Sequence, residues 1–188
     1  MAYLSCEQLD NMGFKFLGEN VKVSDQASIY NPELISIGDN SRIDDFCVIS
    51  GKVEIGKYVH ITPMCLVAGG EPGVYLSDFW RLAYGVKIFS QSDDYSGETM
   101  VNSLVDTHFK SETLSKVTLL KHVVLGANSV VLPGVTIAEG CSAGAMTLFN
   151  KSTEEWGVYV GSPAKRIKER KKDLLKLEVH FLKEQSSD

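Results

Sequence analysis

The sequence is poor in the residues that cross-link small domains or bind metals. It contains four cysteines and four histidines among 188 residues, and the cysteines form no CxxC pair and no cluster with histidine. Disulfide frameworks and structural zinc sites need such spacings, so neither is expected. The cysteines are interpreted as small buried hydrophobic residues, which suits a reducing cytoplasm.

A surplus of basic residues and a long apolar run are also missing. The formal charge is −5 and the pI is near 5.4, which argues against binding to a nucleic-acid backbone. No uncharged apolar stretch is long enough to span a bilayer, and residues 1–20 lack a basic region followed by an apolar one. We therefore expect a single-domain cytoplasmic protein with neither a nucleic-acid partner nor a membrane span.

What the sequence does contain is a six-residue period of aliphatic side chains. The first unbroken ladder consists of Ile37, Ile43, Ile49, Ile55, Ile61 and Val67, and the second of Leu119, Leu125, Val131, Ile137, Ala143 and Phe149. Four residues after each ladder position stands a second small or branched residue, such as Cys47 or Val123. A helix would need apolar spacings of three and four, and a free strand would alternate. A step of six predicts short strands and turns stacked into a β-solenoid.

The repeats resemble the [LIV]-G-x-x-x-x hexapeptides of bacterial sugar acetyltransferases, including the galactoside and maltose acetyltransferases. The similarity spans residues 17–168, and its most specific parts are residues 125–137 and the GxPA segment Gly161-Ser162-Pro163-Ala164. It implies an all-β fold, a left-handed parallel β-helix with three hexapeptides per turn. It further implies a homotrimer with sites between neighbouring subunits, coenzyme A as a partner, acetyl-CoA as the donor and no metal.

The ends and one interruption set the expected organisation. Ser5 and Gln8 form a candidate capping box, so residues 1–16 are expected to cap one end. The β-helix is expected over residues 17–161, and a C-terminal helix over residues 162–188. Between residues 90 and 116 the period is lost, and a long excursion from a regular scaffold is usually functional. In the resembled family a protruding loop near this position closes over the acceptor, so 90–116 is the expected substrate loop.

The resemblance also implies the catalytic residues. Galactoside acetyltransferases carry a catalytic histidine where this chain has Gln91 to Tyr95, without histidine. The chain is more similar to polysaccharide-biosynthesis acetyltransferases with an SDDYSG loop and a histidine in the preceding coil. That likeness implies His60 as the base, with Asp93 or Asp94 orienting it or holding the sugar; His108 is the weaker candidate. The candidate sugar-binding residues are Tyr84, Ser92, Tyr95 and Ser96, although the two tyrosines and Trp80 would equally suit packing between subunits.

Small residues along one predicted edge are the candidate donor site. Gly126, Ala127, Gly144 and Ala145 would let a pantetheine arm approach the backbone, toward the turn at Pro163. Small residues would equally suit tight corners of the solenoid. Lys165 and Arg166 are candidate ligands of the coenzyme A phosphates, and the alternative is that the basic run 165–172 is a solvated face.

The resemblance thus implies an acetyltransferase for surface polysaccharide such as O-antigen, and the missing loop histidine favours an amino group of a nucleotide-linked deoxysugar as its acceptor. The first alternative is a sugar O-acetyltransferase. A hydroxyl acceptor would need a well-placed base, whereas a neutral amine is already nucleophilic. The second is a non-catalytic solenoid scaffold. A zinc carbonic anhydrase would need three convergent histidines, and His60, His108 and His122 do not stand at regular coil spacing.

Overall fold

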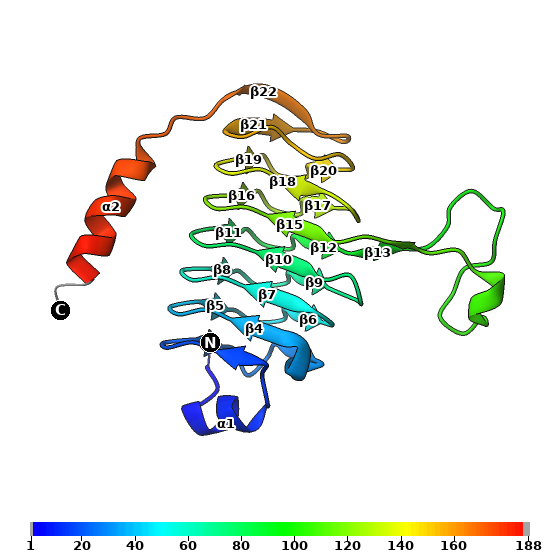
Figure 1. The fold of residues 1–188 in the computed structure, drawn as a ribbon, viewed down its shortest axis with the longest axis horizontal. Helices are drawn as coiled ribbons and strands as arrows, with labels where there is room; N and C mark the ends of the chain where they lie inside the picture. The colour runs from blue at the N-terminus through cyan, green and yellow to red at the C-terminus, as the bar shows by residue number, and fades with distance from the viewer. Residues whose placement is uncertain (1, 186–188) are drawn as a thin grey trace.

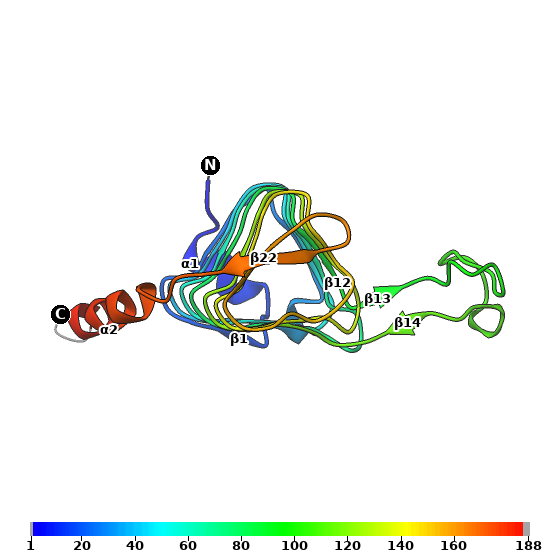
Figure 2. The same cartoon turned by 90° about the horizontal axis from the view of Figure 1, so that it is seen from above.

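Three short strands and three turns make up each coil, which explains why aliphatic residues recur at every sixth position. The computed structural model describes residues 2–185. Parallel pairing joins residues about one coil apart, as in Arg42 with His60, which are eighteen positions apart. The coils stack one on another (Figure 1) and form a three-sided prism when seen from above (Figure 2). Within residues 2–185, no helix has both the length and the apolar character needed to cross a membrane.

Each side of the prism is one sheet. The first face consists of β1 (Phe16–Leu17), β4 (Ile35–Ile37), β7 (Val53–Ile55), β10 (Val74–Leu76), β15 (Val117–Leu119) and β18 (Thr136–Ile137). The second face consists of β2 (Lys22–Val23), β5 (Arg42–Ile43), β8 (His60–Ile61), β11 (Arg81–Leu82), β16 (Val124–Leu125), β19 (Ser142–Ala143), β21 (Gly157–Val160) and β22 (Lys165–Glu169). The third face consists of β3 (Ser28–Tyr30), β6 (Val48–Ser50), β9 (Leu66–Ala68), β12 (Lys87–Phe89), β17 (Val130–Val131) and β20 (Leu148–Phe149).

The coils wind with the left-handed sense that the family resemblance implies. Seen from above, the chain passes from the first face to the second and then the third in a clockwise direction, rising toward the viewer (Figure 2). This is the opposite of the usual right-handed crossover between parallel strands. The expected left-handed parallel β-helix is therefore confirmed.

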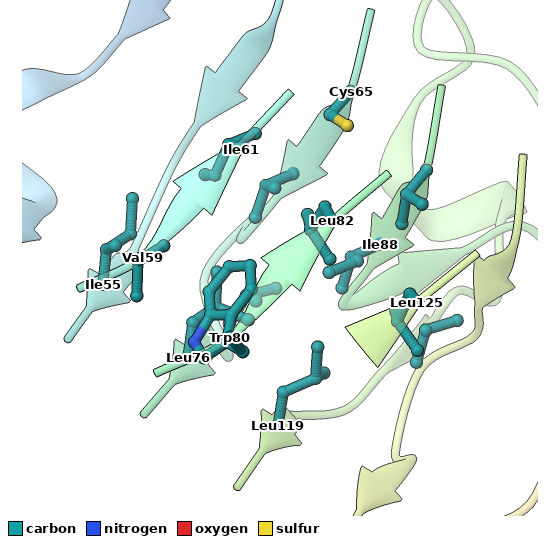
Figure 3. Packing of buried hydrophobic residues seen from close by; sticks show 14 of the residues in the cluster. Ile55, Val59, Ile61, Cys65, Leu76, Trp80, Leu82, Ile88, Leu119 and Leu125 are labelled. Atoms are coloured by element: carbon teal, nitrogen blue, oxygen red, sulfur yellow. The ribbon is translucent and has the colours of Figure 1, made fainter. Parts of the chain in front are cut away.

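The two aliphatic ladders fill the interior of the prism. Every residue of both ladders is buried, and so are the small residues that follow them. Leu76, Leu82, Ile88 and the neighbouring rungs pack in layers from coil to coil (Figure 3). Trp80 lies inside with them, 3% exposed, and its Nε1 donates to the carbonyl of Ser77 at 2.7 Å. The expectation that Trp80 packs between subunits is therefore wrong, because its side chain points into the prism.

Both ends of the prism are closed. At the lower end α1 (Cys6–Asn11) begins with the predicted capping box: the Gln8 amide donates to Ser5 Oγ at 3.2 Å, and the Ser5 amide donates to Gln8 Oε1 at 2.8 Å. A short 3-10 helix, η1 (Pro32–Leu34), follows in the first coil. At the upper end β22 pairs antiparallel with β21 and crosses the top of the last coil (Figure 2).

The expected helix over residues 162–188 is corrected by this strand. Residues 165–169 extend along β21, because the last strand of the second face would otherwise present an unpaired backbone edge. The helix α2 (Leu174–Gln185) begins only after that strand, and residues 186–188 lie outside the described part of the chain. Figure 1 shows α2 descending beside the coils.

The excursion leaves the prism as an arm at the corner between the third and first faces. Its base is a two-stranded antiparallel ribbon of β13 (Gln91–Ser92) and β14 (Thr113–Leu114), and η2 (Thr107–Phe109) lies near its tip. The arm projects far from the coils in both views (Figures 1 and 2).

Candidate active site

A charged cluster is built around His60 on the outer side of the second face. His60 Nε2 lies 2.8 Å from Asp44 Oδ2. Arg42, which is paired with His60 in the strand register, donates from Nε and Nη2 to the two Asp44 oxygens at 2.7 and 3.0 Å. The Tyr3 hydroxyl also donates to Asp44 Oδ1, at 3.4 Å. The His60 side chain is 32% exposed, whereas that of Asp44 is 2% exposed.

Asp44 is an ionised carboxylate although it is buried. Burial raises its pKa, but the hydrogen bonds from Arg42 and His60 and the positive charge of Arg42 outweigh burial, so the pKa of Asp44 lies below its ordinary value. A carboxylate that accepts from Nε2 selects the tautomer with the proton on that nitrogen. The partly exposed ring therefore offers the lone pair of Nδ1 as a proton acceptor.

The other histidines have different surroundings. His122 is buried, although it stands in a turn between two strands. Its Nε2 lies 2.8 Å from Glu178 Oε2 on α2, and its ring stacks on Phe79. His108 lies on the arm, 64% exposed, with Nδ1 2.8 Å from Asp106. Among residues 2–185, no group of three or more histidine, cysteine or acidic side chains could hold a metal ion.

A second cluster lies at the base of the arm. Ser92, Asp93 and Tyr95 line a pocket of about 390 Å³ together with Leu66, Ala68, Phe89, Gln91 and Leu132. The pocket lies on the third face, and the Tyr95 side chain is 89% exposed. Three of the five candidate residues between Ser92 and Ser96 thus share one hollow with apolar strand residues.

Asp94 is turned into its own loop. It accepts from the amide and hydroxyl of Ser96 at 2.8 and 2.9 Å, and from the amide and hydroxyl of Thr99 at 3.2 and 2.8 Å. These bonds, those from Ser96 foremost, lower the pKa of Asp94 to about 2. Within one chain Asp94 and Ser96 therefore order the arm, and the partner that orients His60 is Asp44 instead of Asp93 or Asp94.

The two clusters do not meet within one subunit. His60 lies on the second face. Asp93 follows β13 at the base of the arm, which leaves the third face at the edge farther from the second face (Figure 2). Tyr84 lies between them, on the edge that joins the second and third faces. Its carbonyl accepts from the Asn128 amide at 2.9 Å, which places it in the coil below Ala127.

The candidate donor residues occupy the upper part of the same edge. Gly126 and Ala127 lie one coil below Gly144 and Ala145, since the Met146 amide donates to the Ala127 carbonyl at 2.8 Å. A Cβ on Gly126 would lie 2.5 Å from the carbonyl carbon of Gly144, so stacking of the coils itself requires glycine there. Pro163 and Lys165 line a pocket of about 270 Å³ at the upper end of the prism, together with residues 149–153 at the end of β20. Arg166 lies beside them on β22, with Nε 3.9 Å from Glu154.

Sequence reasoning missed Arg42, Asp44 and Tyr3. A signal for the first two was present, because Ile43 and Ile61 are ladder residues one coil apart. That spacing places Arg42 beside His60, and Asp44 follows directly. Tyr3 gave no such signal, since it precedes the periodic region and reaches Asp44 only through the path of the N-terminal segment.

Known proteins are similar to this chain in sequence and in fold. Residues 35–69 match the model of the bacterial transferase hexapeptide (six repeats). The chain is 44% identical, over 96% of its length and 95% of the relative's, to a dTDP-4-amino-4,6-dideoxy-D-glucose acyltransferase of Escherichia coli.

Two solved structures of AntD, an N-acyltransferase from Bacillus cereus, are similar throughout. The complex with dTDP and 3-hydroxybutyryl-CoA is 42% identical, covers 98% of each chain and superposes with a TM-score of 0.96. A variant in complex with dTDP-4-amino-4,6-dideoxyglucose and coenzyme A is 43% identical, covers 97% of this chain and 98% of the other, and also gives a TM-score of 0.96. The chain therefore belongs to the hexapeptide-repeat acyltransferase family and is an acyltransferase.

Proposed function

We propose that this enzyme transfers an acyl group from a coenzyme A thioester to the 4-amino group of dTDP-4-amino-4,6-dideoxyglucose. The observation that carries the proposal is the full-length similarity to an E. coli acyltransferase of this sugar, together with the AntD complex that holds the same sugar and coenzyme A. Within residues 2–185 the Nδ1 of the partly exposed His60 accepts no hydrogen bond. It adds a proton acceptor on the second face, in the coils below the candidate donor residues.

In the proposed reaction, the neutral amine attacks the thioester carbonyl. The new C–N bond forms as the C–S bond breaks, the amine proton passes to Nδ1 of His60, and coenzyme A leaves as the thiolate. Asp44 stabilises the imidazolium, since it stays ionised and holds Nε2. The acyl donor is proposed to lie along Gly126, Ala127, Gly144 and Ala145, with its phosphates near Lys165 and Arg166.

The proposed assembly is a homotrimer with the site between adjacent subunits. Support comes from the separation of the two clusters, because a second copy could bring the arm residues Asp93 and Tyr95 of one subunit to His60 of the next. Large apolar side chains are also exposed along the edge between the second and third faces, among them Phe46, Met64 and Met146.

The proposal places the enzyme in the cytoplasm and its product in surface polysaccharide synthesis, such as that of O-antigen. A sugar that is still linked to its nucleotide remains activated for glycosyl transfer.

The deciding experiment follows thiol release from acetyl-CoA and from 3-hydroxybutyryl-CoA with three acceptors. These are dTDP-4-amino-4,6-dideoxyglucose, the same amino sugar without its nucleotide, and dTDP-glucose, which offers only hydroxyls. We expect rapid release with the first alone, and a loss of about 100-fold or more in kcat for His60→Ala. Turnover of dTDP-glucose at a similar rate would favour O-acylation, and no thiol release with any acceptor would overturn the proposal.

A further inference from the structure

Four basic side chains lie one above another on the second face. The register pairs Lys22 with Arg42, Arg42 with His60, and His60 with Arg81, so these four outward positions lie in consecutive coils. Neighbouring strands are about 4.8 Å apart. Above Arg81 the outward positions are uncharged: Val124, Ser142 and Val158. Basic residues return only on β22, at the upper end of the face, where Lys168 pairs with Val158. The lower half of this face thus carries its own separate group of positive charges, in a chain whose net charge is −5.

Only part of this charge is neutralised. Asp44 pairs with Arg42 and His60, but it engages only Nε and Nη2 of the guanidinium, which leaves Nη1 available. Within residues 2–185, neither Lys22 nor Arg81 forms an ion pair with a carboxylate. The Lys22 ammonium lies 6.0 Å from the centre of the Tyr3 ring, and the Arg42 guanidinium lies 5.9 Å from it. The Tyr3 ring therefore lies beside both cations.

A polar hollow opens beside the lower two cations. It measures about 360 Å³ and is lined by Asn20, Lys22, Asn40, Ser41 and Arg42. The amides of Asn20 and Asn40 are hydrogen-bonded to each other at 3.2 Å at its rim. The lining contains no acidic residue and no large apolar side chain, which suits an anionic ligand.

We propose that Lys22 and Arg42 bind the diphosphate of the nucleotide sugar in this hollow; the assignment rests on the proposed function. In dTDP-4-amino-4,6-dideoxyglucose the diphosphate is attached at C1 and the amine at C4, at opposite ends of one hexose ring. A ring whose amine reaches His60 therefore carries its diphosphate one or two strand spacings away, about 5–10 Å. Arg42 lies one strand below His60 and Lys22 two strands below it.

Coenzyme A also carries a diphosphate, so the source of the anion must be distinguished. The candidate donor edge lies in the coils above His60, whereas the hollow lies in the coils below it. Acyl donor and nucleotide sugar would then approach the same histidine from opposite ends of the prism. This arrangement assigns Lys22 and Arg42 to the acceptor and leaves Arg81 on the donor side.

The test is calorimetric titration of the full-length protein with dTDP and, separately, with coenzyme A. We expect Lys22→Gln to weaken dTDP binding about tenfold and Lys22→Glu to weaken it further, because a phosphate loses a charged hydrogen bond and then meets a like charge. Coenzyme A binding should stay unchanged in both variants. The weakening should shrink at high salt, which screens exposed charges. Lys22 is exposed, and matching thermal melting curves would show that its variants fold.

Two control variants remove a positive charge elsewhere. Lys15→Gln alters an exposed lysine beside the first face, where its ammonium lies 3.6 Å from Glu54, and should bind dTDP like the wild type. Arg81→Gln removes the charge on the other side of His60 and should change dTDP affinity less than Lys22→Gln does. Unchanged dTDP binding in the Lys22 variants, an equal loss in Arg81→Gln, or loss of coenzyme A binding instead would each overturn the diphosphate assignment. Wild-type protein that fails to bind dTDP would overturn the proposed function as well.

Discussion

Asp44 lies behind His60 in the proposed site, and its side chain is only 2% exposed. Asp44 fixes the proton on Nε2 of His60 and is itself held by Arg42 at 2.7 Å. An asparagine of the same shape could present its amide to His60 and favour the other tautomer. Asp44 is thus a positioning residue, and its effect should appear in the rate of the chemical step more than in substrate binding.

We expect Asp44→Asn to lower kcat about 10- to 100-fold with little change in KM for the sugar. Steady-state kinetics on Asp44→Asn, His60→Ala and the double variant measure this directly. If Asp44 acts through His60, the double variant should be no slower than His60→Ala alone. Independent, multiplying losses would show that Asp44 has a role apart from the histidine.

The same carboxylate should link stability to pH. Its pKa in the folded protein lies below the ordinary value of 3.8. Asp44 therefore stabilises the fold above pH 3.8, and this contribution is lost as the pH falls through the lower folded value. The melting temperature of Asp44→Asn should depend less on pH between about 6 and 2.5 than that of the wild type. Parallel curves for the two proteins would contradict the assignment.

At the scale of the element, close stacking of coils explains some glycines and not others. A Cβ on Gly126 would meet the backbone of Gly144 at 2.5 Å. A Cβ on Gly144 would approach no backbone atom closer than 3.9 Å, and its nearest neighbour would be a methyl group of Val160 at 3.0 Å. Backbone cannot move aside without separating the coils, but a side chain can turn. The two glycines occupy equivalent positions in adjacent coils, so they form a matched pair.

Gly126→Ala should therefore cost about 1–3 kcal/mol of unfolding free energy, and Gly144→Ala less than about 1 kcal/mol. Urea denaturation of both variants would measure the difference. Equal costs would mean that the coils relax around either methyl group. A loss of acetyl-CoA affinity in Gly144→Ala without loss of stability would in turn support the proposed path of the pantetheine arm.

Helix α2 is attached to the prism by a few charged and aromatic contacts. Glu178 pairs with His122 and Lys121, while Phe181 packs edge-on against Tyr58 and Phe79. Burial raises the pKa of Glu178, but its hydrogen bonds outweigh this, and the net pKa lies below 4.5. The ion pairs therefore stabilise docking above pH 4.5 and are lost as the pH falls through the lower folded value.

Glu178→Gln should consequently increase hydrogen exchange across Leu174–Gln185 several-fold at neutral pH while the coils stay protected. Lys176→Gln, which changes an exposed side chain of the same helix, serves as the control. Uniform protection in both variants would show that the aromatic contacts alone hold α2.

At the scale of the whole molecule, what the sequence could predict depends on repetition. Each coil repeats the environment of the one below, so the aliphatic ladders identify the solenoid and its interior residues. Contacts that are made at only one place in the structure, and are not repeated from coil to coil, could not be predicted in this way. Strand β22 was mistaken for helix, because its pairing with β21 depends on the open end of the last coil. The burial of His122 depends on where α2 returns to the prism. The arm has no sequence period at all, so the hydrogen bonds that Asp94 accepts from Ser96 and Thr99 could not be predicted.

The proposed trimer gives the most decisive test of the whole molecule. Phe46, Met64 and Met146 are 58%, 63% and 66% exposed along one edge, and such side chains are expected to be covered in a stable assembly. Met64→Asp should give a monomer by light scattering, with unchanged circular dichroism and activity reduced at least about 100-fold, since His60 would lose the arm of its neighbour. Phe16→Asp, which alters a 55% exposed side chain on the first face, should remain an active trimer. A wild-type protein that is monomeric and fully active would instead mean that one chain builds the whole site, and the arm would then have to fold back toward the second face of its own prism.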